Sequence, residues 1–354
     1  MAETLPAPVL RADQAHHEIL TRVAFSRHLN PVNANEARAA FLAGAHAPPF
    51  AYHPLDEADE ILARLDEVEP PRDHPLGALV GRCLDETRLL VVALRDRTAA
   101  AFDELARASD WYPRPEDLAL RFEDPPPDPE RADLSSQALV DALRQALNAR
   151  GLLDWHIEED PVMSARVLVD GAKRLLRVHP HARFRRRDLV RLVVHEIDVH
   201  AVRAWNGARQ PLRCFDTGLP GSLATEEGLA LVAEEVAQAS SPGVLARQQR
   251  VSAAILVARE AGFREVYRSL LDAGSDLAWG VALRIKRGLG QPGAPGVYAK
   301  DSVYLRGRMD VRAWLDAGRS VGHLYVGKVG LEDPVGSWLA EGWVQPGEVP
   351  SLWG

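Results

Sequence analysis

Two histidines and a glutamate form the strongest chemical signal in the sequence. His195, Glu196 and His200 lie in the segment HEIDVH, within a helix predicted from Arg186 to Trp205. Histidine pairs on one helical face are typical zinc ligands of metallopeptidases. The spacing here is i, i+5, which separates the two side chains by about 140° in an ideal α-helix. A π-bulge would bring them to one face, and such bulges favour functional sites. The alternative is one buried, hydrogen-bonded histidine and one surface histidine.

A pair of glutamates follows in the segment TEEGLA, residues 225–230. Thr225 is predicted to cap a helix that runs to Ala239, and acids in a first turn stabilise the helix dipole. The functional alternative is a third metal ligand. A site of two histidines and one glutamate leaves a position for water, as in catalytic zinc sites.

The elements around these residues predict an α+β fold, mostly helical and zincin-like. Helical patterns fill the first 120 residues, and the proline-rich stretch 123–129 predicts a linker. Residues 152–158 alternate like a strand, and Asp170-Gly171 predicts a two-residue hairpin turn. We therefore expect a small antiparallel sheet before the metal helix, where an exposed strand would hold substrate. The predicted domains are an N-terminal helical region, 1–130, and a catalytic domain, 131–354.

The composition narrows the function classes. The chain has 354 residues, of which 46% are hydrophobic and 26% charged, with 42 Lys+Arg against 50 Asp+Glu and a net charge of −8. An acidic chain is a poor candidate for nucleic-acid binding, and no apolar run is long enough for a membrane helix. Its start lacks the pattern of a signal peptide. The two cysteines, Cys83 and Cys214, show no CxxC spacing, so we expect a cytoplasmic protein.

Lysine is rare in this chain. It occurs four times, at Lys173, Lys286, Lys300 and Lys328, whereas the other basic residues are arginines. Lysine retained in an arginine-rich chain indicates a need for a compact point charge, although chance retention on the surface is an equal alternative.

Taken in order, these segments resemble the microtubule-associated tyrosine carboxypeptidases and their bacterial relatives with a QEGLA motif. HEIDVH, WNGARQP and TEEGLA carry the resemblance. It continues in KRG at 286–288, YAKDSVYLRG at 298–307 and GKV at 327–329, and it covers nearly the whole chain. That family carries HExxxH rather than HExxH, and three of the four lysines fall in matched segments.

The resemblance implies a zinc metallocarboxypeptidase. It implies that His195, His200 and Glu227 bind zinc and that Glu196 is the general base that activates a zinc-bound water. Asp198 departs from the small residue expected at its position. Tyr304 is our candidate for a donor to the oxyanion. Arg209, Arg287 and Lys300 are candidates to bind the terminal carboxylate of the substrate, with ordinary ion pairs as the alternative for each.

The implied substrate is a peptide or protein tail with a tyrosine-like C-terminal residue. An endopeptidase or aminopeptidase on the same site is one alternative, and a non-catalytic zinc-binding regulatory protein is another. A helical scaffold without metal is the least favoured. Cys214 is expected to be a buried, inert thiol. The oligomeric state stays open.

Overall fold

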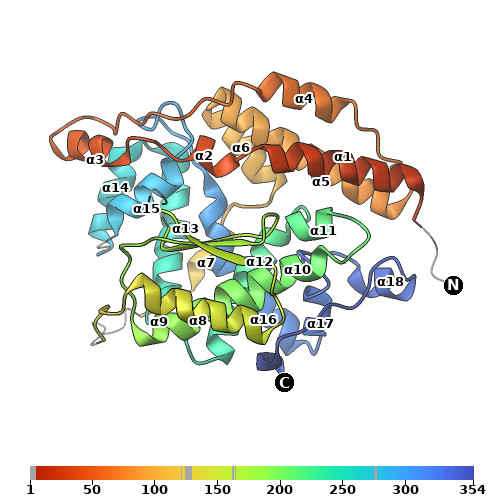
Figure 1. Ribbon diagram of the computed structural model, residues 1–354. Coiled ribbons are helices and arrows are strands. Elements are labelled where there is room, and N and C mark those ends of the chain that lie inside the picture. Colours follow the sequence, from red (N-terminus) through yellow and green to blue (C-terminus); the bar gives the residue numbers. More distant parts are fainter. Residues whose placement is uncertain (1–4, 121, 124–129, 162, 164, 275–276) are drawn as a thin grey trace. The chain divides into compact units, whose positions relative to one another are not determined.

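The computed structural model describes residues 5–120, 122–123, 130–161, 163, 165–274 and 277–354. It is α+β, mostly helical, with a small sheet in the described part of the chain (Figure 1). No helix within the described ranges is long and apolar enough to cross a membrane. Residues 124–129 of the predicted linker lie outside the described residues.

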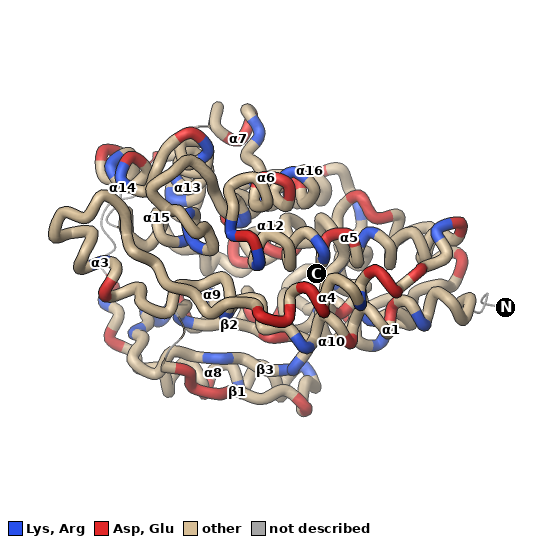
Figure 2. The backbone as a smooth tube through the Cα atoms, turned by 90° about the horizontal axis from the view of Figure 1, so that it is seen from above, with Lys and Arg blue, Asp and Glu red and all other residues tan. Residues whose placement is uncertain are grey.

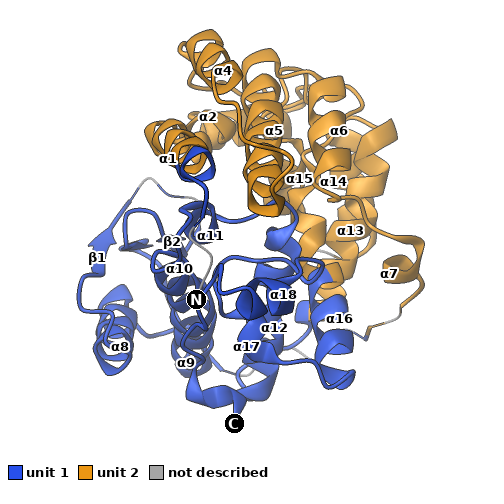
Figure 3. Ribbon diagram, turned by 90° about the vertical axis from the view of Figure 1, so that its right-hand side faces the viewer, with its two compact units in different colours: residues 1–10, 123–244, 307–354 blue, residues 11–122, 245–306 orange. Residues whose placement is uncertain are grey.

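The chain forms two compact units that are discontinuous in sequence (Figure 3). Unit 1 contains residues 1–10, 123–244 and 307–354, and unit 2 contains 11–122 and 245–306. The sequence predicts a single boundary, at residue 130. In the structure the chain passes between the units at residues 10–11, 122–123, 244–245 and 306–307, so residues 245–306 group with the N-terminal helices. Charged residues of both signs are distributed over both units (Figure 2).

Unit 2 is helical in its described residues. Its core contains aromatic rings in edge contact, such as Phe41 and Phe263 with centroids 5.0 Å apart. Its elements, of which α1 and α13 also include residues of unit 1, are α1 (Ala7–Arg22), α2 (Phe25–Leu29), α3 (Ala34–Leu42), α4 (Ala58–Asp66), α5 (Pro75–Asp96), α6 (Ala99–Ala108), α7 (Pro115–Ala119), α13 (Val244–Glu260), α14 (Phe263–Asp272), α15 (Ala278–Lys286) and the 3₁₀ turn η2 (Ala299–Ser302).

Unit 1 contains the sheet and the predicted metal helix. Helix α8 buries Leu139, Leu143 and Leu147, whose spacing of four places them on one face. Its elements are α8 (Ser136–Ala149), β1 (His156–Glu159), β2 (Val167–Asp170), β3 (Leu175–Val178), α9 (Arg186–Leu192), the π-helix η1 (Val193–Ala201), α10 (Val202–Gly207), α11 (Cys214–Thr217), α12 (Ser222–Val236), most of α16 (Val303–Asp316), α17 (Val321–Leu324), α18 (Val335–Ala340) and the 3₁₀ turn η3 (Ser351–Trp353).

The sheet is mixed, so the prediction of an antiparallel sheet was wrong. The strand order is β1-β3-β2, with β1 parallel to β3 and β2 antiparallel to it. The most apolar strand, β3, takes the centre because its side chains are the most deeply buried of the three strands. β1 pairs with the other side of β3 and runs parallel to it.

The predicted two-residue turn was also wrong. Asp170 pairs with Leu175, so residues 171–174 form a four-residue loop. The Asp170 carboxylate accepts the Lys173 N–H at 3.2 Å, and Arg174 adopts a left-handed conformation with φ of 51°. The hydrogen bond to Asp170 gives the N–H of Lys173 a partner within the four-residue loop.

Candidate metal centre

A π-helix brings the two histidines together. The predicted helix from Arg186 to Trp205 is confirmed as the continuous run α9, η1 and α10, and η1 covers the whole HEIDVH segment. Because a π-helix places i and i+5 one turn apart, His195 and His200 share one face. Their ring centroids lie 4.9 Å apart. The i, i+5 spacing therefore requires this irregular helix.

Glu227 reaches the same point from α12. Its Oε2 lies 3.6 Å from His195 Nε2 and 3.8 Å from His200 Nε2. One donor atom from each of the three residues lies within 4.8 Å of the others, and no other such group occurs among the described residues. Two zinc bonds of about 2.0–2.2 Å span roughly 4 Å, so this donor set fits a zinc ion.

Helix α12 begins earlier than the sequence predicted. It starts at Ser222 with Gly221 as N-cap, so Thr225 is not the cap. The Thr225 hydroxyl instead accepts the N–H of Leu331 at 3.0 Å. Both glutamates thus lie beyond the first turn, on a helix whose residues are buried from Thr225 to Glu234. Their role is not to balance the helix dipole, and buried carboxylates there need partners.

Two glycines set the position of Glu227. A Cβ on Gly228 would lie 2.1 Å from the carbonyl carbon of Gly307, and a Cβ on Gly307 would lie 1.8 Å from the carbonyl oxygen of Ala224. Any side chain at either position would push α12 and α16 apart. The glycine of TEEGLA and the last glycine of YAKDSVYLRG therefore make the close contact that places the neighbouring glutamate.

Each histidine is held from behind by a carboxylate. His195 Nδ1 lies 2.8 Å from Glu234 Oε1, and His200 Nδ1 lies 2.8 Å from Glu226 Oε1. A proton on Nδ1, donated to the carboxylate, leaves the lone pair of Nε2 for a metal. Both Nε2 atoms are on the side of Glu227, so the rings are oriented for ligation.

One buried and two half-buried cations support these two carboxylates. Arg191 Nη1 lies 3.2 Å from Glu234 Oε1. Arg203 Nη1 donates to Glu226 Oε2 at 2.8 Å, and Lys328 Nζ lies 3.3 Å from Glu226 Oε1. Burial alone would raise the pKa of Glu226, but Lys328 and Arg203 outweigh it and hold that pKa well below its usual range. Glu226 is therefore an anion that accepts from His200.

The pKa of His195 is also shifted by the carboxylates around it. Burial by itself lowers its pKa, but hydrogen bonds with Glu227 and Glu234 outweigh that effect and raise the pKa to about 10. A metal must therefore displace a proton from this site.

Glu196 and Asp198 both lie in η1, in different surroundings. Glu196 is 9% exposed and follows His195 directly. Asp198 is buried and pairs with Arg150, the C-cap residue of α8, whose Nη2 lies 2.8 Å from Oδ2. Burial raises the pKa of Asp198, and Arg150 opposes that shift. Asp198 thus joins a structural ion pair. Cys214 is buried, as expected.

The predicted substrate and oxyanion residues are divided between the units. Arg209 belongs to unit 1, where it stacks on Trp205 at 4.4 Å and pairs with Glu348 at 3.3 Å. The others, Arg287, Lys300 and Tyr304, belong to unit 2, where Arg287 stacks on Tyr298 and Tyr304 lies beside Arg284. Their roles at the metal centre stay predictions.

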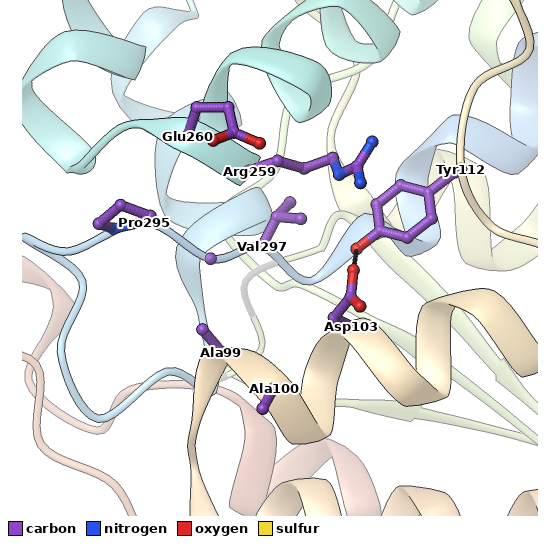
Figure 4. Close-up of a pocket in the computed structure, with 9 residues that line it drawn as sticks. Ala99, Ala100, Asp103, Tyr112, Arg259, Glu260, Pro295 and Val297 are labelled. Atoms are coloured by element: carbon purple, nitrogen blue, oxygen red, sulfur yellow. Dashed lines mark hydrogen bonds between the residues drawn. The ribbon is translucent and has the colours of Figure 1, made fainter.

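Unit 2 also has a cavity of about 240 Å³ (Figure 4). There the Tyr112 hydroxyl donates to Asp103 at 2.7 Å, and the Arg259 guanidinium lies 4.5 Å from the centre of the Tyr112 ring. None of the predicted site residues lines this cavity.

Comparison with known proteins identifies the family of the chain. The family model described as microtubule-associated tyrosine carboxypeptidase matches residues 43–353. The chain belongs to this family. The human microtubule-associated tyrosine carboxypeptidase 1 is 31% identical over 183 residues, which cover 48% of this chain and 37% of the human protein. The mouse and rat proteins of that name are 30% identical over 164 residues, 43% of this chain and 33% of theirs.

The chain thus matches only about a third of the length of these carboxypeptidases. The sequence did not predict that Glu234, Arg203 and Lys328 support the predicted ligands. Glu234 follows Glu227 by seven residues, and Arg203 follows His200 by three, so each shares a helical face with a predicted ligand. Helical spacing from each predicted ligand was a usable signal for these two. Lys328 had no such signal.

Proposed function

We propose that this chain is a zinc-dependent carboxypeptidase that removes a tyrosine-like residue from the C-terminus of a peptide or protein tail. The supporting observation is the convergence of His195, His200 and Glu227, with Glu196 next to the first ligand. The names of the related carboxypeptidases support the direction of cleavage.

In this proposal His195, His200 and Glu227 would hold the zinc, which would supply a Lewis acid and a water of lowered pKa. Glu196 would take a proton from the attacking water and pass it to the leaving amine. Glu226 and Glu234 keep the two imidazoles in the orientation and tautomer that ligation requires.

The first experiment measures metal content by mass spectrometry. We expect about one zinc per chain in the wild type and its loss in Glu227→Ala. Glu235→Ala is the matched control, because Glu235 lies on the same helix but pairs with Arg308 at 2.8 Å. A wild type without metal, and indifferent to chelator, would overturn the zinc site.

The second experiment measures hydrolysis of an N-acetylated peptide that ends in tyrosine. Zinc-loaded wild type should release free tyrosine, and Glu196→Gln should keep zinc but lose activity by about 10²- to 10⁴-fold. Internal fragments would identify an endopeptidase instead. Equal behaviour of wild type and Glu196→Gln would favour a non-catalytic zinc-binding protein.

A further inference from the structure

A carboxypeptidase must recognise the terminal carboxylate of its substrate. That task requires a cation that reaches solvent and keeps a free hydrogen-bond donor. The following inference rests on the proposed function. The cations of unit 1 next to the proposed metal ligands differ in how well they meet these two conditions.

Two of the three cations in the metal-centre network are already occupied. Arg203 is fully buried and donates to Glu226 and to the carbonyl oxygens of Leu324, Gly327 and Val329. Arg191 is 14% exposed and is shared between Glu234 and Asp188. Arg203 therefore cannot reach a substrate, and Arg191 lies between two carboxylates.

Lys328 differs from both. Its side chain is 18% exposed, and Glu226 is its ion-pair partner in the described part of the chain. An ammonium has three donors, so two remain for a ligand. Glu226 Oε1 also lies 2.8 Å from His200 Nδ1. The carboxylate of Glu226 therefore connects the Lys328 ammonium with the proposed metal ligand His200.

Main-chain hydrogen bonds fix the backbone of Lys328 beside Glu226. Its N–H donates to the carbonyl of Phe215 at 2.7 Å, and its carbonyl accepts from Leu219 at 3.0 Å. Arg203 binds the carbonyl oxygens of both neighbouring residues, Gly327 and Val329. A cation fixed in this way loses little conformational entropy when it binds a carboxylate.

The Lys328 ammonium also lies close to one edge strand of the sheet. β2 is an edge strand of the described sheet, and it contacts η1. It is followed directly by Gly171, where a Cβ would lie 3.6 Å from Lys328 Nζ. A peptide that pairs with the open edge of β2 would therefore have one end beside Lys328.

We infer that Lys328 is a specificity-determining residue, which binds the terminal carboxylate of a peptide held along β2. Glu226 then has two functions, to orient His200 and to orient this ammonium.

The test measures peptide binding in the zinc-loaded Glu196→Gln variant, so that nothing is cleaved. The probe is a fluorescent, N-blocked pentapeptide that ends in tyrosine, as the free acid and as the C-terminal amide. We expect the free acid to bind at least about 10-fold more tightly. Adding Lys328→Met should abolish this preference, and adding Lys328→Arg should restore part of it. Lys173→Met is the matched control, since Lys173 is 57% exposed and pairs with Asp170.

Zinc content and thermal unfolding are measured for every variant. A preference for the free acid that persists with Lys328→Met would assign the carboxylate to another cation and overturn this inference alone. Loss of zinc from Lys328→Met would show that Lys328 acts only on the metal site, through Glu226 and His200, and would also overturn the inference. If the Glu196→Gln parent shows no preference for the free acid, both this inference and the carboxypeptidase proposal fail.

Discussion

The two units each bury a histidine, and the two side chains have opposite electrostatic properties. In unit 2, His16 is 3% exposed, and its Nε2 lies 2.8 Å from the Thr87 hydroxyl. Burial, with a smaller contribution from His17, lowers its pKa to about 4. In unit 1, carboxylates overcome burial and raise the pKa of His195 to about 10. Burial alone therefore does not set the pKa of a histidine, because the charged groups that surround it can reverse the direction of the shift.

The buried cations of the two units differ in the same way. Lys286 of unit 2 is fully buried, and its ammonium lies 2.5–3.2 Å from the carbonyl oxygens of Ala258, Ala261, Ala294 and Gly296. Those four acceptors take up its three donors, so Lys286 stabilises the fold. In unit 1, Lys328 keeps donors available and is partly exposed. Both lysines lie in matched motifs, but only the second has capacity for a ligand.

The largest effect should come from Lys286→Met. The variant removes the ammonium from four carbonyl oxygens, of which only that of Ala258 has a further donor, the N–H of Gly296, among the main-chain hydrogen bonds of the described residues, so we expect the free energy of unfolding to fall by on the order of 3 kcal/mol. Urea unfolding followed by tryptophan fluorescence measures it. Lys173→Met is the control, because a surface pair contributes little. Unchanged stability in Lys286→Met would remove the distinction between the two buried lysines.

The next effect concerns pH and His16. Its unfolded pKa is 6.5 and its folded pKa is about 4, so the unfolded state binds more protons between these values. The contribution of His16 to stability should be largest above pH 6.5 and fall by about 3 kcal/mol as the pH is lowered through 4.

His16→Gln keeps a partner for Thr87 but does not titrate. Unfolding curves measured between these two pH values should therefore fall less steeply with acid in the variant than in the wild type. Equal slopes for the two proteins would show that His16 is already protonated in the folded state.

The smallest effect should come from the carboxylate behind His195. Glu234→Gln weakens the hydrogen bond to Nδ1, so we expect zinc affinity to fall by about 10- to 100-fold. Competition with a chromophoric chelator measures it. Glu235→Gln, next along α12, should leave zinc affinity unchanged because Glu235 binds Arg308 instead. If both variants behave alike, the carboxylate–histidine pairs have no special role.

The sequence alone located the candidate ligands and the helix that carries them. It also indicated that the i, i+5 spacing of His195 and His200 needs a π-helical turn, because helical geometry is local and can be counted along the chain. The mostly helical α+β class followed from the same periodicity. The family resemblance, now supported by a match over residues 43–353, selected Glu227 over Glu226.

Only the tertiary structure decided the surroundings of those ligands. It made β1 parallel to β3, grouped residues 245–306 with the N-terminal helices and placed Glu226, Glu234 and Lys328 around the metal centre. These outcomes depend on contacts between segments far apart in sequence, such as Glu226 and Lys328. No local pattern specifies such contacts, because each residue's propensity is compatible with many partners and only packing selects among them.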